Sequence, residues 1–197
     1  MKTGIKEGAR RLADPIVRGL HALGVTPDQV TFVGLALSLA AAVAAGLGRF
    51  GLATLLLVLG SVCDMLDGGL ARLSGKGSRF GAFLDSTIDR YAELGLFVGY
   101  AVYYAGHGTP LDVAVVCVAA AGSILVSYAR ARAEGLGIDC NVGLMERPER
   151  LVLLIVATAL GPVVLLWALR LLAVLTHLTA LQRIRHVHGR LRSETRG

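Results

Sequence analysis

Charged side chains are scarce in this chain of 197 residues, of which only 17% are Asp, Glu, Lys or Arg while 54% are hydrophobic. A soluble domain usually has about 25% charged residues. The shortage argues against a soluble protein of this size and indicates one that crosses a membrane several times. We therefore expect one membrane domain over residues 1–197, without a separate soluble domain.

Cysteine is also rare, and the three residues are Cys63, Cys117 and Cys140. They show no CxxC spacing, and two lie in apolar runs, so neither a disulfide nor a zinc site is expected. The first 18 residues are polar and basic and have no apolar core, so they do not resemble a secretory signal peptide.

The net charge of +6 might suggest nucleic acid as a partner. The basic residues lie in short loops and at the ends of apolar runs, however, where membrane lipids and phosphorylated substrates are the expected partners. We expect no nucleic-acid binding.

Apolar runs separated by turns that contain Gly or Pro predict an all-α polytopic membrane protein with six transmembrane helices. Before the first run, residues 5–23 carry the apolar stripe of an amphipathic helix that lies on the membrane surface. Thr26 followed by Pro27 is typical of a helix N-cap and first helical residue. Residues 182–197 are expected to form a basic cytosolic tail. The six spans are expected at roughly 29–47, 52–73, 79–104, 111–131, 146–160 and 163–181.

The placement of Lys and Arg predicts the orientation in the membrane. With six spans, the basic residues gather at both termini, at the 74–78 turn and at the connection before residue 146, whereas the opposite side has only Arg49. Both termini and the 74–78 turn are therefore expected on the cytosolic side of the cytoplasmic membrane.

Four aspartates lie within two of the apolar runs, where each costs at least ~2.5–3.5 kcal/mol to insert. Asp64 and Asp67 precede the 74–78 turn, and Asp85 and Asp89 follow it at nearly matching distances. In an antiparallel helix pair their carboxylates would converge near the cytosolic end. Converging carboxylates need a counter-charge, and an oxygen-only set suits Mg²⁺ or Mn²⁺, so we expect two divalent cations.

Two other interpretations of the aspartates remain open. They could form buried ion pairs with Arg72, Arg79 and Arg90, or they could belong to a six-span cation transporter. A transporter would hold its acids near the bilayer centre, whereas these lie toward the cytosolic end.

The residues around the aspartates resemble a family signature. The pattern D-x-x-D-G-x-x-A-R, then eight residues, then G-x-x-x-D-x-x-x-D resembles the motif of the CDP-alcohol phosphotransferases. The resemblance implies transfer of a substituted phosphoryl group from a CDP-activated donor, usually CDP-diacylglycerol, to a hydroxyl acceptor, with release of CMP. The fixed positions are occupied by Asp64, Asp67, Gly68, Ala71, Arg72, Gly81, Asp85 and Asp89.

The resemblance also implies roles for residues. Asp64, Asp67, Asp85 and Asp89 would be metal ligands, and Asp89 would also act as the catalytic base nearest the attacking hydroxyl. A homodimer is implied in the same way. The Thr26-Pro27-Asp28-x-x-Thr31 segment resembles the family's nucleotide-contacting entry, although it is equally an ordinary helix N-terminus. The nucleotide would be bound by Asp28, Thr31, Asp67, Gly68, Arg72 and Ser78.

Arginines gather at the cytosolic ends of the last three spans, and guanidinium groups bind phosphate oxygens bidentately. These segments resemble the phosphatidylinositol-phosphate synthase branch of the family, whose acceptor is inositol phosphate. Glycerol 3-phosphate is the alternative acceptor, and the arginines could instead anchor helix ends to lipid phosphates. Arg170, deep in the last span, has no role evident from the sequence. On the resemblance, the acceptor phosphate would be held by Ser127, Arg130, Arg132, Arg150 and Arg183.

Overall fold

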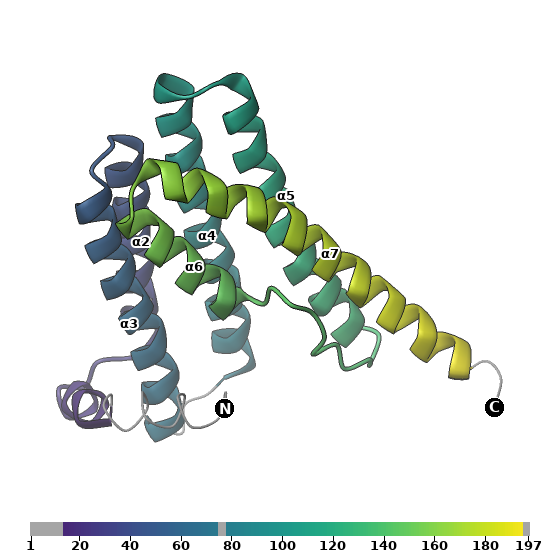
Figure 1. Cartoon of the computed structure of the whole chain (residues 1–197). Coiled ribbons are helices and arrows are strands. Elements are labelled where there is room, and N and C mark those ends of the chain that lie inside the picture. The colour runs from purple at the N-terminus through teal and green to yellow at the C-terminus, as the bar shows by residue number, and fades with distance from the viewer. Residues whose placement is uncertain (1–13, 75–77, 195–197) are drawn as a thin grey trace.

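The computed structural model describes residues 14–74 and 78–194, and its regular secondary structure over these residues is entirely helical, which confirms the all-α prediction. A helical segment at 14–22 precedes six longer helices (Figure 1). The bounds of the first five lie close to those of the expected spans, whereas the last helix extends well beyond its expected end. The six helices are α2 (Pro27–Gly46), α3 (Phe50–Ser74), α4 (Arg79–His107), α5 (Pro110–Glu134), α6 (Arg147–Ala159) and α7 (Pro162–Glu194).

Short connections make most neighbouring helices antiparallel. Gly48, between α2 and α3, has a φ of 72°, and Gly161, between α6 and α7, has a φ of 95°; both values favour glycine. Thr26 caps α2 in a capping box with Gln29, as its sequence predicts. The end of α3 and the start of α4 consequently lie at the same end of the bundle, which is the lower end in Figure 1.

The helices pack in two groups. α2 packs mainly against α3 and α4, α5 packs along α7, and α6 lies between α3 and α7. The largest apolar core joins the groups and includes Leu57, Leu96, Tyr100 and Leu169, each at most 3% exposed. α2 and α4 approach so closely at Gly99 that a Cβ there would lie 2.2 Å from the carbonyl oxygen of Ala42.

Four of the described helices, α2, α3, α5 and α7, are long and apolar enough to cross a membrane. α4 has 29 residues, but its first half carries several charged side chains. α6 has only 13 residues, or about 20 Å at 1.5 Å per residue, which is shorter than the ~30 Å hydrocarbon layer. Length and composition therefore support four spans directly.

The ends of the chain differ in part from expectation. Residues 5–13 of the expected amphipathic helix lie outside the described residues. In the helical 14–22 segment, Val17 is buried in a small apolar cluster with Leu66 and Leu70 of α3. The basic tail expected after residue 181 is instead a continuation of α7, which remains helical through Glu194.

We predict that Gly99→Ala lowers the stability of the fold by roughly 1–3 kcal/mol, because the added methyl group overlaps a backbone oxygen that cannot move without shifting α2. Thermal unfolding of the purified protein in detergent measures the change. Gly106→Ala is the matched control, since Gly106 also lies in α4 but has open space around it. That variant should unfold at or slightly above the wild-type temperature, because alanine favours helix. Equal unfolding temperatures for the two variants would contradict the close contact.

Candidate active site

Three of the four aspartates of the signature come together between α3 and α4. One carboxylate oxygen from each of Asp64, Asp85 and Asp89 lies within 4.8 Å of the others. The helix geometry explains this arrangement, because Asp85 and Asp89 are four residues apart on α4 and face the last turns of α3. The fourth aspartate, Asp67, lies beside this group, where its Oδ2 accepts a 2.7 Å hydrogen bond from the Thr31 hydroxyl.

A cavity of about 510 Å³ opens next to Asp67 and Asp85, between α2, α3 and α4. Its volume is in the range of small-molecule sites. The Ser78 hydroxyl at its edge accepts a 2.8 Å hydrogen bond from the Gly81 amide and so caps α4. All six residues that the family resemblance assigned to the nucleotide line this cavity, namely Asp28, Thr31, Asp67, Gly68, Arg72 and Ser78.

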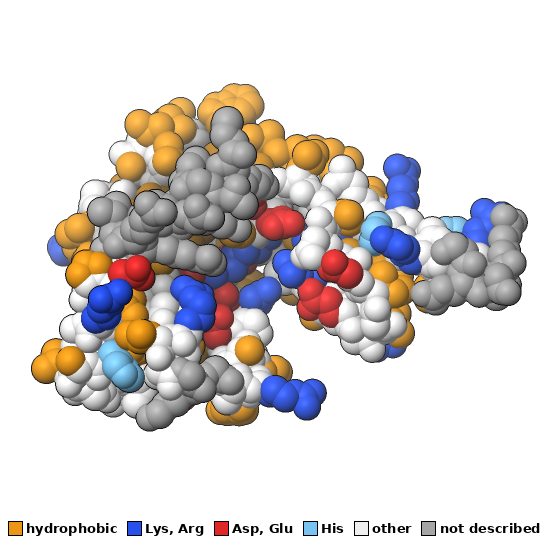
Figure 2. All heavy atoms as spheres, turned by 90° about the horizontal axis from the view of Figure 1, so that it is seen from below, with side chains coloured by type: hydrophobic (Ala, Val, Ile, Leu, Met, Phe, Trp, Pro, Cys, Tyr) orange, Lys and Arg blue, Asp and Glu red, His pale blue; other side chains and the backbone are white. Residues whose placement is uncertain are grey.

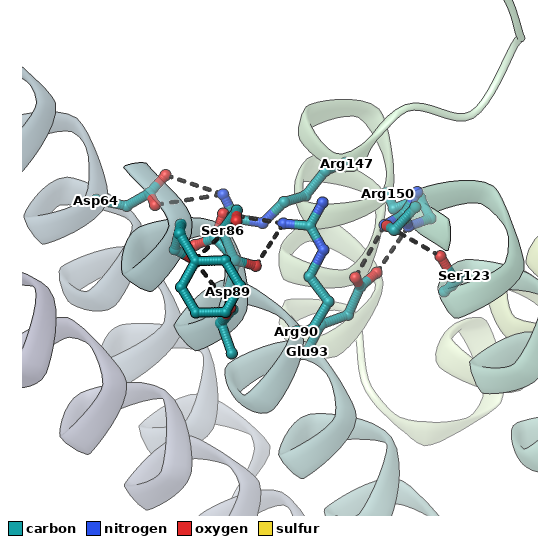
Figure 3. Close-up of polar contacts among 11 residues, drawn as sticks. Asp64, Ser86, Asp89, Arg90, Glu93, Ser123, Arg147 and Arg150 are labelled. Carbon is teal, nitrogen blue, oxygen red and sulfur yellow. Dashed lines mark hydrogen bonds and ion pairs between the residues drawn. The ribbon is translucent and has the colours of Figure 1, made fainter. Parts of the chain in front are cut away.

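Arg147 is a site residue that the sequence analysis missed. It is the first residue of α6, and its guanidinium points into the aspartate group (Figure 3). Its Nη2 lies 2.6 Å from Asp89 Oδ1, and its Nη1 lies 3.2 Å from Asp64 Oδ2. Of the arginines considered as ion-pair partners, Arg90 approaches Asp89 at 3.5 Å. Arg147 and Arg90 thus supply positive charge to carboxylates that would otherwise repel one another.

The aspartate group fits a divalent cation. Its donor atoms are all carboxylate oxygens, the type that Mg²⁺ and Mn²⁺ prefer. Asp85 Oδ1 is buried and has no hydrogen-bond partner among the described residues. A buried oxygen without a partner is costly, and a bound cation would satisfy it.

Arg150 occupies a different position from the one expected of an open phosphate site. Its side chain is 1% exposed and donates from Nε and Nη2 to the two carboxylate oxygens of Glu93, at 2.7 and 2.9 Å. Nη1 donates to the Met145 carbonyl at 3.1 Å. Glu93 lies one helical turn after Asp89 and was also missed by the sequence analysis. The bidentate pair fixes the start of α6 against α4.

The other arginines of the expected acceptor set divide between the interior and the surface. Arg183 is 2% exposed and donates to the carbonyls of Val142 and Val126. Arg132 is exposed, and Arg130 is half-buried and pairs with Glu134 at 2.8 Å. The structure thus does not gather the set around one open space.

An open groove lies between α4 and α5. Ser127 and Arg130 line it together with Arg90 and Tyr128, and its volume is about 570 Å³. From below, acidic and basic side chains gather around a hollow in this end of the molecule (Figure 2). Arg90 lines the groove and also contacts Asp89, so it lies between the groove and the aspartate group.

Arg170 takes a structural position away from this site. Its Nη2 lies 3.1 Å from Asp112 Oδ1, and its guanidinium carbon lies 4.7 Å from the centre of the Trp167 ring. The pair joins α7 to the first turn of α5.

A helical membrane protein with an aspartate group beside a cavity of nucleotide size has the features of a phosphotransferase that works at the membrane. Residues 24–184 match the family model described as CDP-alcohol phosphatidyltransferase, and the chain belongs to this family.

Relatives with named activities cover nearly the whole chain. The archaetidylinositol phosphate synthase of Pyrococcus horikoshii is 35% identical over 192 residues, which are 97% of this chain and 98% of that protein. The phosphatidylinositol phosphate synthase of Mycobacterium bovis is 36% identical over 188 residues, covering 90% and 86%.

Solved structures agree with the fold. The Mycobacterium tuberculosis phosphatidylinositol phosphate synthase in complex with manganese and citrate superposes with a TM-score of 0.84 at 35% identity, covering 89% of this chain and 88% of that chain. The same enzyme with CDP-DAG bound gives a TM-score of 0.83 at 34% identity, covering 90% and 94%.

We predict that Arg150→Ala lowers stability by roughly 3–5 kcal/mol, because it leaves the Glu93 carboxylate buried without its partner. Thermal or denaturant unfolding in detergent measures the loss. Arg130→Ala removes an exposed pair and should cost about 0–1 kcal/mol. The double variant Arg150→Met with Glu93→Leu should recover much of the loss, since apolar residues can replace a buried pair. Similar losses for Arg150→Ala and Arg130→Ala would show that the Glu93 pair does not anchor α6.

Proposed function

We propose that this protein transfers the phosphatidyl group of CDP-diacylglycerol to a hydroxyl of inositol phosphate and releases CMP. The observation that carries the proposal is the convergence of Asp64, Asp85 and Asp89 beside the cavity lined by the signature residues. Membership of the family and the activities of its relatives support the same activity.

The aspartate group has two sides, and we assign one substrate to each. Asp67 and Asp85 face the 510 Å³ cavity, where Gly68, Arg72 and Ser78 would hold the cytidine diphosphate part of the donor. Asp89 faces the other side, toward Arg147 and α6, and lines smaller cavities there. The acceptor hydroxyl would approach from this second side.

Two divalent cations, Mg²⁺ or Mn²⁺, would be held by Asp64, Asp67, Asp85 and Asp89. When bound, such ions neutralise the diphosphate and the charge that develops on the leaving group. A manganese complex of the M. tuberculosis relative supports this assignment.

The transfer balances without a further reactant. The acceptor hydroxyl oxygen forms a bond to the lipid-bearing phosphorus, and the bond from that phosphorus to the bridging oxygen breaks, so that CMP leaves with the bridging oxygen. Asp89 would accept the hydroxyl proton, and its place on the acceptor side of the group suits this role. Positioning and electrostatic stabilisation would supply most of the rate enhancement.

We propose that the acceptor phosphate is held at the cytosolic ends of α4–α7. Ser127 and Arg130 line the open groove there, and Arg132 is exposed nearby on α5. Arg150 and Arg183 are buried, but each keeps N–H groups beyond those it gives to the protein, because a guanidinium has five donors.

We further propose six spans, with both termini and the aspartates on the cytosolic side. The charges in the first half of α4 would face the protein interior. α6, at about 20 Å, would cross where the bilayer thins locally to match its short apolar length. The 5–23 segment would lie on the inner membrane surface, and the assembly would be a homodimer, which a monomeric mass in detergent would contradict.

We predict that Asp85→Asn lowers CMP release at least ~100-fold, since it removes one carboxylate from the group that balances transition-state charge. The assay uses purified protein, CDP-diacylglycerol, inositol phosphate and Mg²⁺. Asp139→Asn, which changes an exposed acid outside the group, is the control and should keep wild-type activity. Full activity of Asp85→Asn, or of wild type in EDTA, would exclude the proposed role of the metal ions. No CMP release from wild type with any of the acceptors would leave a cation transporter as the alternative.

The same assay identifies the acceptor. Inositol phosphate should support faster CMP release than unphosphorylated inositol, because arginines near the groove favour an acceptor that carries a phosphate. It should also surpass glycerol 3-phosphate, as the similarity to inositol phosphate lipid synthases indicates. A higher kcat/KM for glycerol 3-phosphate would make the protein a phosphatidylglycerophosphate synthase instead.

For the orientation, we predict that a cysteine at Gly108, between α4 and α5, reacts with an impermeant thiol reagent added to intact cells. Gly108 lies at the opposite end of α4 from the aspartates. The same reagent should label Ser78→Cys only after the cells are opened. Labelling of Ser78→Cys from outside would reverse the topology.

A further inference from the structure

Arg147 uses carboxylate oxygens of two proposed metal ligands. Its two terminal nitrogens contact Asp64 and Asp89 at 3.2 and 2.6 Å, so the guanidinium bridges α3 and α4 (Figure 3). Two small cavities, of about 40 and 30 Å³, are lined by these three side chains. Such cavities have room for about one water molecule or ion.

The guanidinium and a divalent cation therefore compete for the same carboxylates. We propose that Arg147 is a built-in substitute for the metal: it neutralises Asp64 and Asp89 in the metal-free protein and must withdraw before a cation can bind both. This inference rests on the metal site of the proposed function. It adds that the site exchanges between two states. In one state Arg147 pairs with Asp64 and Asp89, and in the other a metal ion is bound to these carboxylates.

The position of Arg147 suits such an exchange. Arg147 is the first residue of α6. Arg150, one turn later, pairs with Glu93 and so holds the start of α6 in place. The Arg147 side chain itself is 26% exposed, which leaves a route toward solvent. A long side chain on a fixed backbone can leave the carboxylates without unfolding the helix.

Arg90 provides the contrast. Its Nη1 lies 3.5 Å from Asp89 but only 2.7 Å from the Ser86 carbonyl, and its side chain is 32% exposed. No contact between Arg90 and Asp64 is found among the described residues. Arg90 therefore adds positive charge near the group without bridging the two helices.

Because of this competition, the apparent Kd for the metal equals the intrinsic Kd divided by the fraction of molecules whose carboxylates are free to bind. If Arg147 occupies the carboxylates in nine molecules of ten, the apparent Kd is raised about tenfold. Removal of the guanidinium should thus tighten metal binding and, at the same time, weaken the metal-free protein, whose carboxylates lose their bridge.

The test measures binding of Mn²⁺ alone to the purified full chain in detergent, by electron paramagnetic resonance of the free ion, without lipid or acceptor. Arg147→Gln should bind Mn²⁺ about tenfold more tightly than wild type. Without metal it should unfold at a lower temperature than wild type, and Mn²⁺ should raise its unfolding temperature by more. Arg147→Lys, which keeps the charge but loses the two-pronged bridge, should tighten binding by a smaller factor.

Arg90→Gln is the matched control for loss of one positive charge beside Asp89, and its Kd should change by less than about threefold. Equal tightening in Arg90→Gln and Arg147→Gln would reduce the effect to general electrostatics and overturn the proposal. Unchanged or weaker binding in Arg147→Gln would overturn it as well. If that variant cannot be purified, Arg147→Lys decides by the same comparison with wild type. The binding test contains no substrate, so its outcome does not depend on catalysis. If wild type binds Mn²⁺ in this test but releases no CMP in the separate activity assay, that result would contradict the proposed function alone.

Discussion

The arrangement of this protein depends on the need to neutralise carboxylates inside an apolar helical bundle. Asp64, Asp85 and Asp89 lie within 4.8 Å of one another, which is too close for three uncompensated charges. Arg147 supplies the local cation, and the buried Arg150–Glu93 pair fixes the helix that carries it. The short α6, which adds little apolar length, thereby has a defined place between α3 and α7.

The aspartates also lie where two cavities adjoin. Asp67 lines both the cavity between α2, α3 and α4 and a smaller cavity that reaches Arg147 of α6, so groups held in the two spaces would come together at the aspartates. A reaction between a nucleotide-linked lipid and a polar acceptor needs such a geometry, because the two negatively charged substrates must approach one phosphorus atom from opposite directions.

The sequence predicts features that depend on local chemistry. Apolar runs and turn residues predicted the helices, and the Thr26-Pro27 pair predicted the start of α2. The aspartate spacing predicted that carboxylates of α3 and α4 converge, which three of the four do. Partners distant in sequence escaped prediction. The sequence assigned no role to Glu93 or to Arg147. Only the fold shows that each faces an opposite charge 57 or more residues away.

A comparison of the two ends of the bundle shows why charge excess, rather than charge itself, marks the candidate site. Near the far end, Asp112 has Arg170 as its ion-pair partner and accepts hydrogen bonds from Thr109, so this acid is satisfied and needs no ligand. At the aspartate group, by contrast, Arg147 and Arg90 contact two of the three carboxylates, those of Asp64 and Asp89, and a buried oxygen of Asp85 has no partner within the described part of the chain. Both ends carry acids in largely apolar helices, but only one keeps negative charge uncompensated. Uncompensated negative charge lowers the stability of the fold unless a cation neutralises it. The excess of carboxylates is therefore explained by the binding of a cation and not by folding.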